Sequence, residues 1–191
     1  ICKFNNCKIF FNYMRISQKS TRILFKHLNN IKGYIKGVAY YRNSLLNDAS
    51  HFINLFQFIF GKVIKVKKNG SIKKDKDEIN FILYFKKAEI QFIPINFIKF
   101  RHSRFEFIHQ KGRLMYNSGH NCFKIYKTKI NSLYKNYHLD SKPHKIIDLN
   151  IKEIQKECVS ELYKMFNKKR YYLCDIVGGI NTMKTINEIK T

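Results

Sequence analysis

The chain has 191 residues, which is enough for one domain with a hydrophobic core and too few for two full domains. Apolar residues make up 45% of it and aromatic residues 15%, so a disordered chain is excluded. Lys and Arg number 37 against 13 Asp and Glu, a net charge of +24 that suggests an anionic partner such as nucleic acid, a phosphate-bearing substrate or a membrane surface.

The composition offers a second explanation of this charge. Lys is abundant together with Asn, Ile, Phe and Tyr, while Gly and Pro number only 8 and 2. An A+T-rich coding sequence produces that combination and makes a protein basic without any functional demand. We therefore favour the compositional origin and do not expect nucleic acid as the partner.

The cysteines and the apolar runs indicate the cellular compartment in which the protein is expected. Five cysteines are spread along the chain with no CxxC pair and no Cys-His cluster at zinc spacing. We therefore expect reduced thiols, no metal site and a cytoplasmic protein. No window approaches ~20 apolar residues, so neither a membrane span nor a membrane partner is expected.

The chain opens at Ile1 within what reads as the middle of an element, which predicts a fragment of a longer protein.

The first half of the chain is predicted to run strand, helix, strand, helix and strand over residues 9–11, 17–30, 34–41, 45–60 and 62–68. In the first helix, Ile23, Leu24 and Leu28 share one face. The second helix keeps apolar residues at helical spacing and ends at Gly61, where a C-terminal glycine belongs.

The second half is predicted to be mostly β-structure. Five short runs rich in Ile, Phe and Tyr, with turns between them, predict an antiparallel meander over residues 79–86, 89–96, 104–109, 113–116 and 122–127. Residues 142–150 are predicted to be irregular.

Two helices are predicted to close the chain. The first covers residues 151–168 and is expected to bury Ile151, Ile154, Cys158, Leu162, Met165 and Phe166. Asp175 is expected to cap the last helix, whose inward residues would be Ile180, Met183, Ile186 and Ile189. Strands grouped together with helices on either side indicate an α+β fold.

One pair of side chains suggests chemistry. Asn47 and His51 lie four residues apart at the start of a helix that follows a strand, so both project from one face. An imidazole beside a carboxamide is suited to holding a substrate hydroxyl, although a single helical His is more often structural. The sequence contains no phosphate-binding loop and no nucleophile elbow. A sheet with exposed aromatics among Lys could instead bind single-stranded nucleic acid, and a non-catalytic interaction module is a further alternative.

A set of ordered motifs resembles a known family. NYMR, GYIKGVAYY and NSLLNDASHFINLFQFIFG follow one another as in the second half of the Gfo/Idh/MocA oxidoreductases, nearest to the bacterial branch associated with surface-polysaccharide sugars. The family's helix motif, D/N-x-x-x-H-x-x-D/N-L ending in F-G, is matched by Asn47, His51, Asn54, Leu55, Phe60 and Gly61. FEFIHQKGRLMYNSGHNCFKIYK and DIVGGINTMKTINEIK resemble the family's hairpin and closing helix.

The resemblance implies a fold and a division of the chain. Residues 34–191 would form a substrate-binding and dimerisation domain, an antiparallel sheet with helices packed on one face. The other face of the sheet would join subunits into a homo-oligomer. Residues 1–33 would be a connector from an N-terminal Rossmann domain that binds NAD or NADP. That domain is expected to be absent, because the chain lacks both the GxGxxG loop and the family's Glu-Lys-Pro lysine.

The resemblance also implies a function. The substrate would be a sugar or nucleotide sugar used in polysaccharide or lipopolysaccharide biosynthesis, and the chain alone would be inactive. His51 would contact or protonate the substrate oxygen during hydride transfer. Asn47 stands where many members have Asp and cannot raise the basicity of the imidazole, so positioning by hydrogen bonds gains weight. The further substrate-facing candidates are Tyr13, Arg15, Tyr41 and Asn43.

Overall fold

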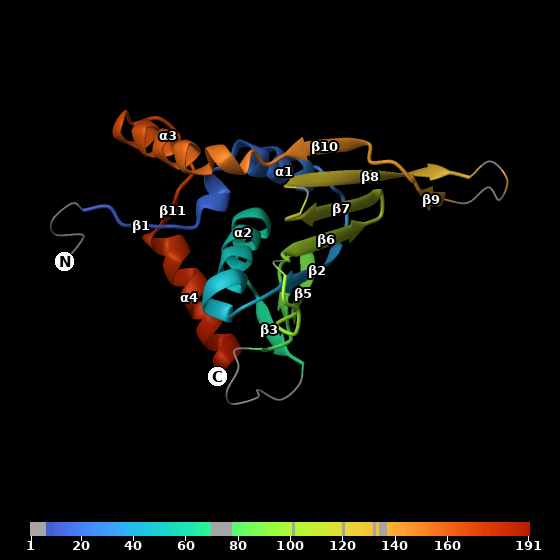
Figure 1. Ribbon diagram of the computed structural model, residues 1–191, viewed down its shortest axis with the longest axis horizontal. Helices are drawn as coiled ribbons and strands as arrows, with labels where there is room; N and C mark the ends of the chain where they lie inside the picture. The colour runs from blue at the N-terminus through green and yellow to red at the C-terminus, as the bar shows by residue number, and fades with distance from the viewer. Residues whose placement is uncertain (1–6, 70–77, 101, 120, 132, 134–136) are drawn as a thin grey trace.

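The computed structural model describes residues 7–69, 78–100, 102–119, 121–131, 133 and 137–191. Figure 1 shows a sheet on one side of the molecule and helices on the other. The elements in chain order are β1 (Phe10–Phe11), η1 (Met14–Ser17), α1 (Lys19–Asn29), β2 (Ile35–Tyr41), η2 (Leu45–Ala49), α2 (Ser50–Phe60), β3 (Lys65–Lys68), β4 (Phe81–Tyr84), β5 (Ala88–Pro94), β6 (Arg104–His109), β7 (Gly112–Asn117), β8 (Cys122–Ile130), β9 (Tyr137–Leu139), β10 (Lys145–Asp148), η3 (Ile151–Glu153), α3 (Ile154–Phe166), β11 (Cys174–Asp175) and α4 (Ile176–Lys190).

The predicted α+β fold, with helices packed on one face of a sheet, is confirmed. Within the described residues, nine strands form the main sheet in the order β10-β8-β7-β6-β2-β5-β4-β3, with β9 paired to β8. Its pairs are antiparallel except β2–β5, which is parallel with Ile35 opposite Ala88 and Tyr41 opposite Pro94. The antiparallel description is corrected at this pair. The chain passes through α2, β3 and β4 before β5 returns beside β2, and local turn signals do not reveal such a crossover.

The core lies between α2 and the inner face of the sheet. Residues of β5 and β6 alternate between buried and partly exposed, so one row of apolar side chains from each of these strands, including Phe92, Phe105 and Phe107, points at the helix. The ring of Phe56 lies 5.2 Å from the rings of both Phe105 and Phe107, and Phe52 lies 5.4 Å from Phe105. These edge-on contacts fix α2, and with it the residues at its start, relative to the strands.

Helix α4 packs against α2 through polar side chains as well as apolar ones. Asn54 Nδ2 donates to Thr182 Oγ1 at 3.1 Å, and Gln57 Nε2 donates to Thr185 Oγ1 at 3.0 Å. The prediction that Ile180 and Met183 face inward is wrong, because they are 43% and 37% exposed while Thr182 and Thr185 are buried. Asp175 does cap the helix, its carboxylate accepting from the Gly178 N–H at 2.9 Å.

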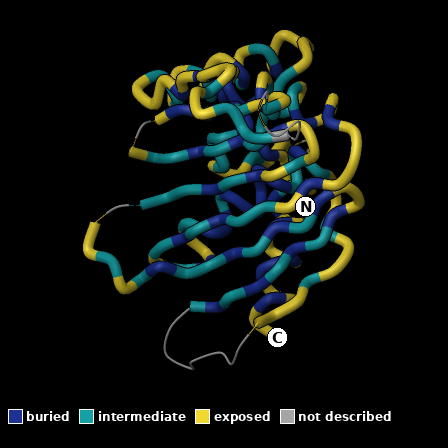
Figure 2. The backbone as a smooth tube through the Cα atoms, turned by 90° about the vertical axis from the view of Figure 1, so that its right-hand side faces the viewer, coloured by how far each residue is buried: buried dark blue, intermediate teal, exposed yellow. Residues whose placement is uncertain are grey.

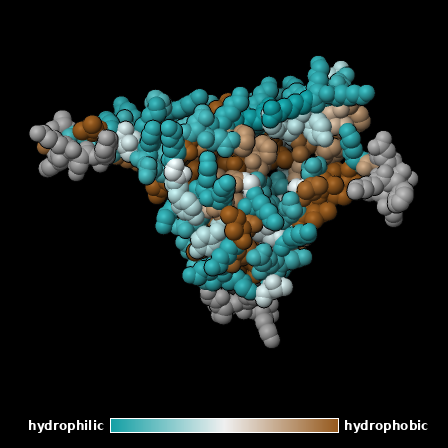
Figure 3. Space-filling view, turned by 180° about the vertical axis from the view of Figure 1, so that it is seen from behind, coloured by the Kyte–Doolittle hydropathy of each residue, from teal (hydrophilic) through white to brown (hydrophobic). Residues whose placement is uncertain are grey.

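The other face of the sheet has no described helix across it. Figure 2 turns this face toward the viewer, and its strands alternate between buried and intermediate residues. Cross-strand pairing places Val38 and Met115 on this face, on either side of Glu106. Figure 3 shows the molecule from behind, where hydrophilic side chains cover most of the described surface and hydrophobic ones gather in its middle.

Two further expectations about the second half are wrong. Residues 142–150 contain a strand, because β10 pairs with β8 from Lys145 opposite Ile125 to Asp148 opposite Cys122. It is an edge strand in which Ile147 alone is buried, so it lacks the apolar alternation that marks strands in sequence. Helix α3 buries Met165 as expected, but the rest of the predicted apolar face is not buried, since Phe166 is 76% exposed and Ile151 45% exposed.

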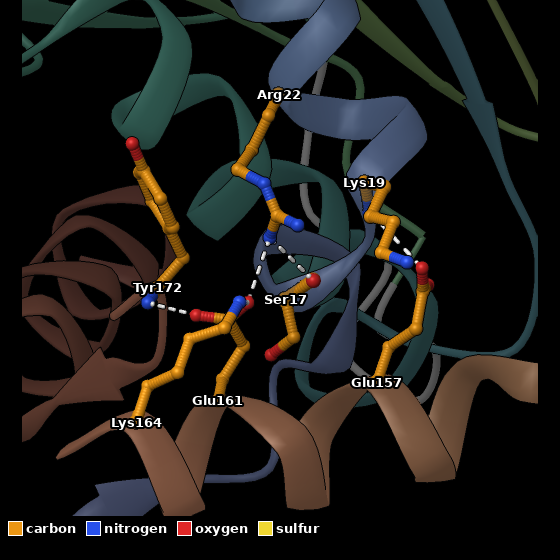
Figure 4. Close-up of polar contacts among 7 residues, drawn as sticks. All are labelled: Ser17, Lys19, Arg22, Glu157, Glu161, Lys164 and Tyr172. Atoms are coloured by element: carbon orange, nitrogen blue, oxygen red, sulfur yellow. Dashed lines mark hydrogen bonds and ion pairs between the residues drawn. The ribbon is translucent and has the colours of Figure 1, made fainter. Parts of the chain in front are cut away.

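A buried carboxylate fixes α3 in place instead. Glu161 is 2% exposed and accepts hydrogen bonds from Arg22 Nη1 at 3.1 Å, Lys164 Nζ at 2.6 Å and the backbone N–H of Tyr172 at 2.8 Å. Figure 4 shows these groups converging on Glu161, with Arg22 also reaching the carbonyl of Ser17. The cluster ties α3 to α1 and η1.

Described residues on both sides of the predicted boundary at residues 33/34 contribute to one buried cluster. Ile16, Leu24 and Leu28 belong to the same buried cluster as the sheet and α2, and β1 pairs with β11 near the other end of the chain. Whether residues 1–33 derive from a cofactor domain stays a prediction. Among the described residues, no helix combines the length and the apolar character needed to cross a bilayer.

Candidate functional site

A cavity of about 570 Å³ lies where η1 and the start of α2 meet the strand ends at Ser103 and Tyr116. Asn47 and His51 both line it, as the predicted helix face requires. The turn that carries Asn47 is a π-helix, η2, in which the Ala49 N–H donates to the Ser44 carbonyl. The Ser44 side chain caps this turn by accepting from the Asn47 N–H at 3.1 Å. Single π-helical turns are frequent at functional sites.

His51 is partly buried at the edge of the cavity. Its ring meets the Tyr13 ring edge-on, with centroids 5.2 Å apart. Burial lowers the pKa of His51 below the ordinary 6.5, and the Arg15 charge lowers it further, while Asp48 acts in the opposite direction. A neutral imidazole keeps a nitrogen lone pair, so this side chain can accept a proton at neutral pH.

Arg15 brings a positive charge to the same cavity. Its Nη1 donates to Tyr116 Oη at 3.2 Å, and its guanidinium carbon lies 5.1 Å from the ring centroids of both Phe52 and Tyr116. Stacking on two rings of the core holds the guanidinium in one orientation. The cavity is therefore lined both by a guanidinium donor in a fixed orientation, that of Arg15, and by an imidazole that can accept a proton, that of His51.

Tyr41 and Asn43 do not line this cavity. Tyr41 is fully buried, and its hydroxyl donates to the Ile79 carbonyl at 2.7 Å and accepts from the Ile79 N–H at 3.0 Å. It anchors the segment before β4, and its assignment to substrate binding is corrected. Asn43 has a φ of +71° and forms a turn, where its backbone N–H donates to Asn96 Oδ1 at 2.7 Å.

Tyr13 reaches the site indirectly, through its ring contact with His51. Burial raises the pKa of the Tyr13 hydroxyl, and a hydrogen bond with the Ser50 side chain partly offsets this. Tyr13 can therefore orient the imidazole. Its contact places it beside the cavity without making it part of the lining.

Most residues that line the cavity were not predicted from the sequence, and two of them, Asp48 and Tyr116, bear directly on its chemistry. Asp48 lies three residues before His51, a spacing that also puts two side chains on one helix face, so the pattern could have included it. Tyr116 comes from β7, and only the strand register brings it near η1. No local signal in the sequence could have identified Tyr116.

Metal ligands do not cluster in the described part of the chain. Within those ranges, His, Cys, Asp and Glu side chains do not gather in groups of three or more that could hold a metal ion. Cys122, Cys158 and Cys174 are free thiols.

Comparison with known proteins gives matches in structure alone. No family model matches the chain, and no curated protein matches it either. Among solved structures, UDP-N-acetylglucosamine 3-dehydrogenase GnnA from Acidithiobacillus ferrooxidans superposes with a TM-score of 0.72 at 11% identity, over 99% of this chain and 62% of that one. An NAD binding oxidoreductase from Klebsiella pneumoniae gives 0.73 at 10% identity, over 99% and 65% of the two chains.

A third structure, the dehydrogenase MviM from Clostridium difficile, gives a TM-score of 0.64 at 12% identity, over 99% of this chain and 62% of that one. The chain thus spans less than two thirds of the length of these structures. At such identities the likeness concerns the fold. The predicted resemblance is confirmed at that level: the chain has the fold of the C-terminal part of Gfo/Idh/MocA-type oxidoreductases.

Proposed function

We propose that this chain is the substrate-binding part of an NAD(P)-dependent oxidoreductase that acts on a sugar or a nucleotide sugar. The observation that carries the proposal is the cavity that unites His51, Asn47 and Arg15 in a fold shared with dehydrogenases. GnnA is named for a nucleotide-sugar substrate, and the Klebsiella oxidoreductase is named for NAD binding. We extend both to this chain, with polysaccharide or lipopolysaccharide biosynthesis as the context.

In this proposal His51 exchanges a proton with the substrate hydroxyl while the hydride moves between the sugar carbon and the nicotinamide. The lowered pKa keeps His51 neutral and ready to accept that proton. Asn47 orients the substrate through hydrogen bonds, since a carboxamide carries no charge. Arg15 donates to a substrate oxygen or to a phosphate of a nucleotide sugar.

NAD or NADP would be held mainly by an N-terminal Rossmann domain outside this chain. The chain carries no GxGxxG loop and spans 62–65% of the structures it matches. The chain alone is therefore expected to be inactive. We place the protein in the cytoplasm, in keeping with the free thiols at Cys122, Cys158 and Cys174.

A second copy of the chain is the proposed partner of the open sheet face. Apolar side chains on this face, such as Val38 and Met115, are only partly buried. Lys36 pairs with Glu89 at 2.9 Å, and Glu106 pairs with two arginines of the same face. These pairs break up the positive stripe that a nucleic-acid-binding sheet would need, so a protein partner fits better. Sedimentation of wild type and Val38→Glu tests this: a dimer that the variant disrupts is expected, and a wild-type monomer would refute it.

The coding DNA upstream of Ile1 is the first test of the function. An in-frame strand–GxGxxG–helix unit followed by Glu-Lys-Pro would support it, and a stop codon followed directly by a start codon would contradict it. In the extended protein, His51→Ala is expected to lower NAD(P)-linked turnover of UDP-N-acetylglucosamine by ~10²-fold or more. His144→Ala, an exposed histidine outside the cavity, serves as the control. Unchanged turnover in His51→Ala would make His51 structural.

A further inference from the structure

A second cavity, of about 630 Å³, lies at the other end of β6 from the candidate site. It is lined by His27 of α1, by Asn30 just after this helix, by the turn from His109 to Lys111, and by Lys127 of β8. Strand β6 begins just after Ser103, which lines the candidate site, and ends at His109, so the two cavities are separated by the length of a six-residue strand, about 17 Å. A ligand here would not meet the substrate.

The two imidazoles in this cavity have unused hydrogen-bonding atoms. The rings of His27 and His109 lie with centroids 6.4 Å apart, and the Nε2 atoms of both are buried without a hydrogen-bond partner among the described residues. His109 Nδ1 accepts from the Lys111 N–H at 3.3 Å, so in the neutral ring the proton is on Nε2, which is a donor. A buried donor without an acceptor destabilises the fold. The cavity therefore lacks an acceptor.

The charges around the cavity favour an anion as that acceptor. Lys111 and Lys127 line it, and no acidic side chain of the described residues does. Burial lowers the pKa of His27, and Lys145, Lys127 and His144 lower it further, so every charge acting on this ring is basic. Burial and the neighbouring His27 lower the pKa of His109. A metal cation would be repelled by the same lysines.

The end of α1 does not compete for these donors. Its last carbonyls are capped, because the Asn30 N–H donates to the His27 carbonyl at 3.3 Å and the Ile31 N–H to the Leu28 carbonyl at 3.1 Å. The two imidazoles and the two lysines line the cavity from α1, from the end of β6 with the turn after it, and from β8. Such a set matches a tetrahedral dianion with three terminal oxygens better than a planar carboxylate.

We propose that this cavity is a second ligand site, which binds the phosphate group of a small molecule through His27, His109, Lys111 and Lys127. The ligand is inorganic phosphate or a phosphomonoester. Binding gives the buried Nε2–H of His109 an acceptor oxygen, and it does the same for Nε2 of His27 once that ring is protonated. It also bridges α1 to the β6–β7 turn and β8. This inference is independent of the proposed oxidoreductase activity.

The test is a titration of this chain with inorganic phosphate, and separately with glucose 6-phosphate, at constant ionic strength. Nuclear magnetic resonance follows the imidazole Hε1 signals and calorimetry gives the Kd. We expect the His27 and His109 signals to shift and the pKa of both rings to rise, because the anion favours their protonated form. Tighter binding of glucose 6-phosphate would identify a phosphomonoester as the ligand, and equal binding the free ion; both support the site.

The double variant His27→Gln/His109→Gln is expected to weaken binding at least ~10-fold, since it loses two hydrogen bonds to a charged group. Each substitution replaces an imidazole that is neutral in the free protein at neutral pH with a neutral carboxamide. Weaker binding therefore cannot be explained by a lower net charge of the free protein. His102→Gln, just before the other end of β6, is the matched control. If the double variant fails to fold, the wild-type signals decide alone. Equal binding by all proteins, shifts that leave His27 and His109 unmoved, or a response to Zn²⁺ without one to phosphate would overturn the proposal.

Discussion

Replacement of Glu161 tests whether one buried carboxylate holds α3 on the rest of the fold. Glu161→Ala removes the shared acceptor of Arg22, Lys164 and the Tyr172 N–H. Breaking a fully buried ion pair costs about 3–5 kcal/mol. Arg22 and Lys164 are 19% and 35% exposed, so water partly replaces the lost contact for them. The backbone N–H of Tyr172 loses its carboxylate acceptor. We expect the free energy of unfolding to fall by ~2–4 kcal/mol.

Urea unfolding followed by circular dichroism measures this change, and two variants calibrate it, one at the same position and one in η3 just before α3. Glu161→Gln keeps the size and one acceptor oxygen, so about half the loss is expected. Glu153→Gln breaks a pair with Lys156 in which the side chains are 42% and 81% exposed, and such a pair contributes at most ~0.5 kcal/mol. If Glu161→Ala cost no more than Glu153→Gln, the carboxylate would not be what secures α3.

Two further predictions concern stability. Tyr41→Phe removes the hydroxyl that bonds both backbone groups of Ile79, and urea unfolding should show a loss of ~2 kcal/mol or more; a loss below ~0.5 kcal/mol would count against this anchor. The pKa values of His27, His51 and His109 are lowered in the folded chain, chiefly by burial, so the unfolded chain binds protons first as the pH falls. The urea midpoint should therefore drop between pH 7.5 and 5.5, and the triple His→Gln variant should lose this dependence; a wild-type midpoint that stays constant would refute the assignment.

Local patterns in the sequence predicted most of the elements and the helix side of the site. Alternation and helical spacing are physical consequences of burial on one face, so β6, with bounds 104–109, and α2, ending at Gly61, could be located from the order of residues alone. The pair of Asn47 and His51 followed from the same periodicity. The resemblance to the oxidoreductases rests on the order of the motifs, and the fold that it implied is the one observed.

What failed depends on contacts between distant segments. Helix α3 looks amphipathic, yet it packs at the edge of the molecule, where a buried carboxylate and not an apolar stripe makes the main attachment. The inner face of α4 is set by the amide side chains that α2 presents, which favours Thr182 and Thr185 over Ile180 and Met183. The role of Tyr41 is decided by Ile79, thirty-eight positions away. Periodicity within one element carries no information about its partner.

Asn47 stands where many members of the family have Asp, and the residue after it, Asp48, carries a carboxylate. Asp48 lines the same cavity and raises the pKa of His51, while burial and Arg15 lower it. The negative charge that a carboxamide cannot supply is thus present one position along the chain, in the π-helical turn that also carries Asn47. Because burial is the largest effect, the imidazole stays neutral, which suits a proton acceptor. The basicity of His51 is therefore set by its burial and by the opposed charges of Arg15 and Asp48, and the Asn at position 47 does not by itself rule out acid–base chemistry at this site.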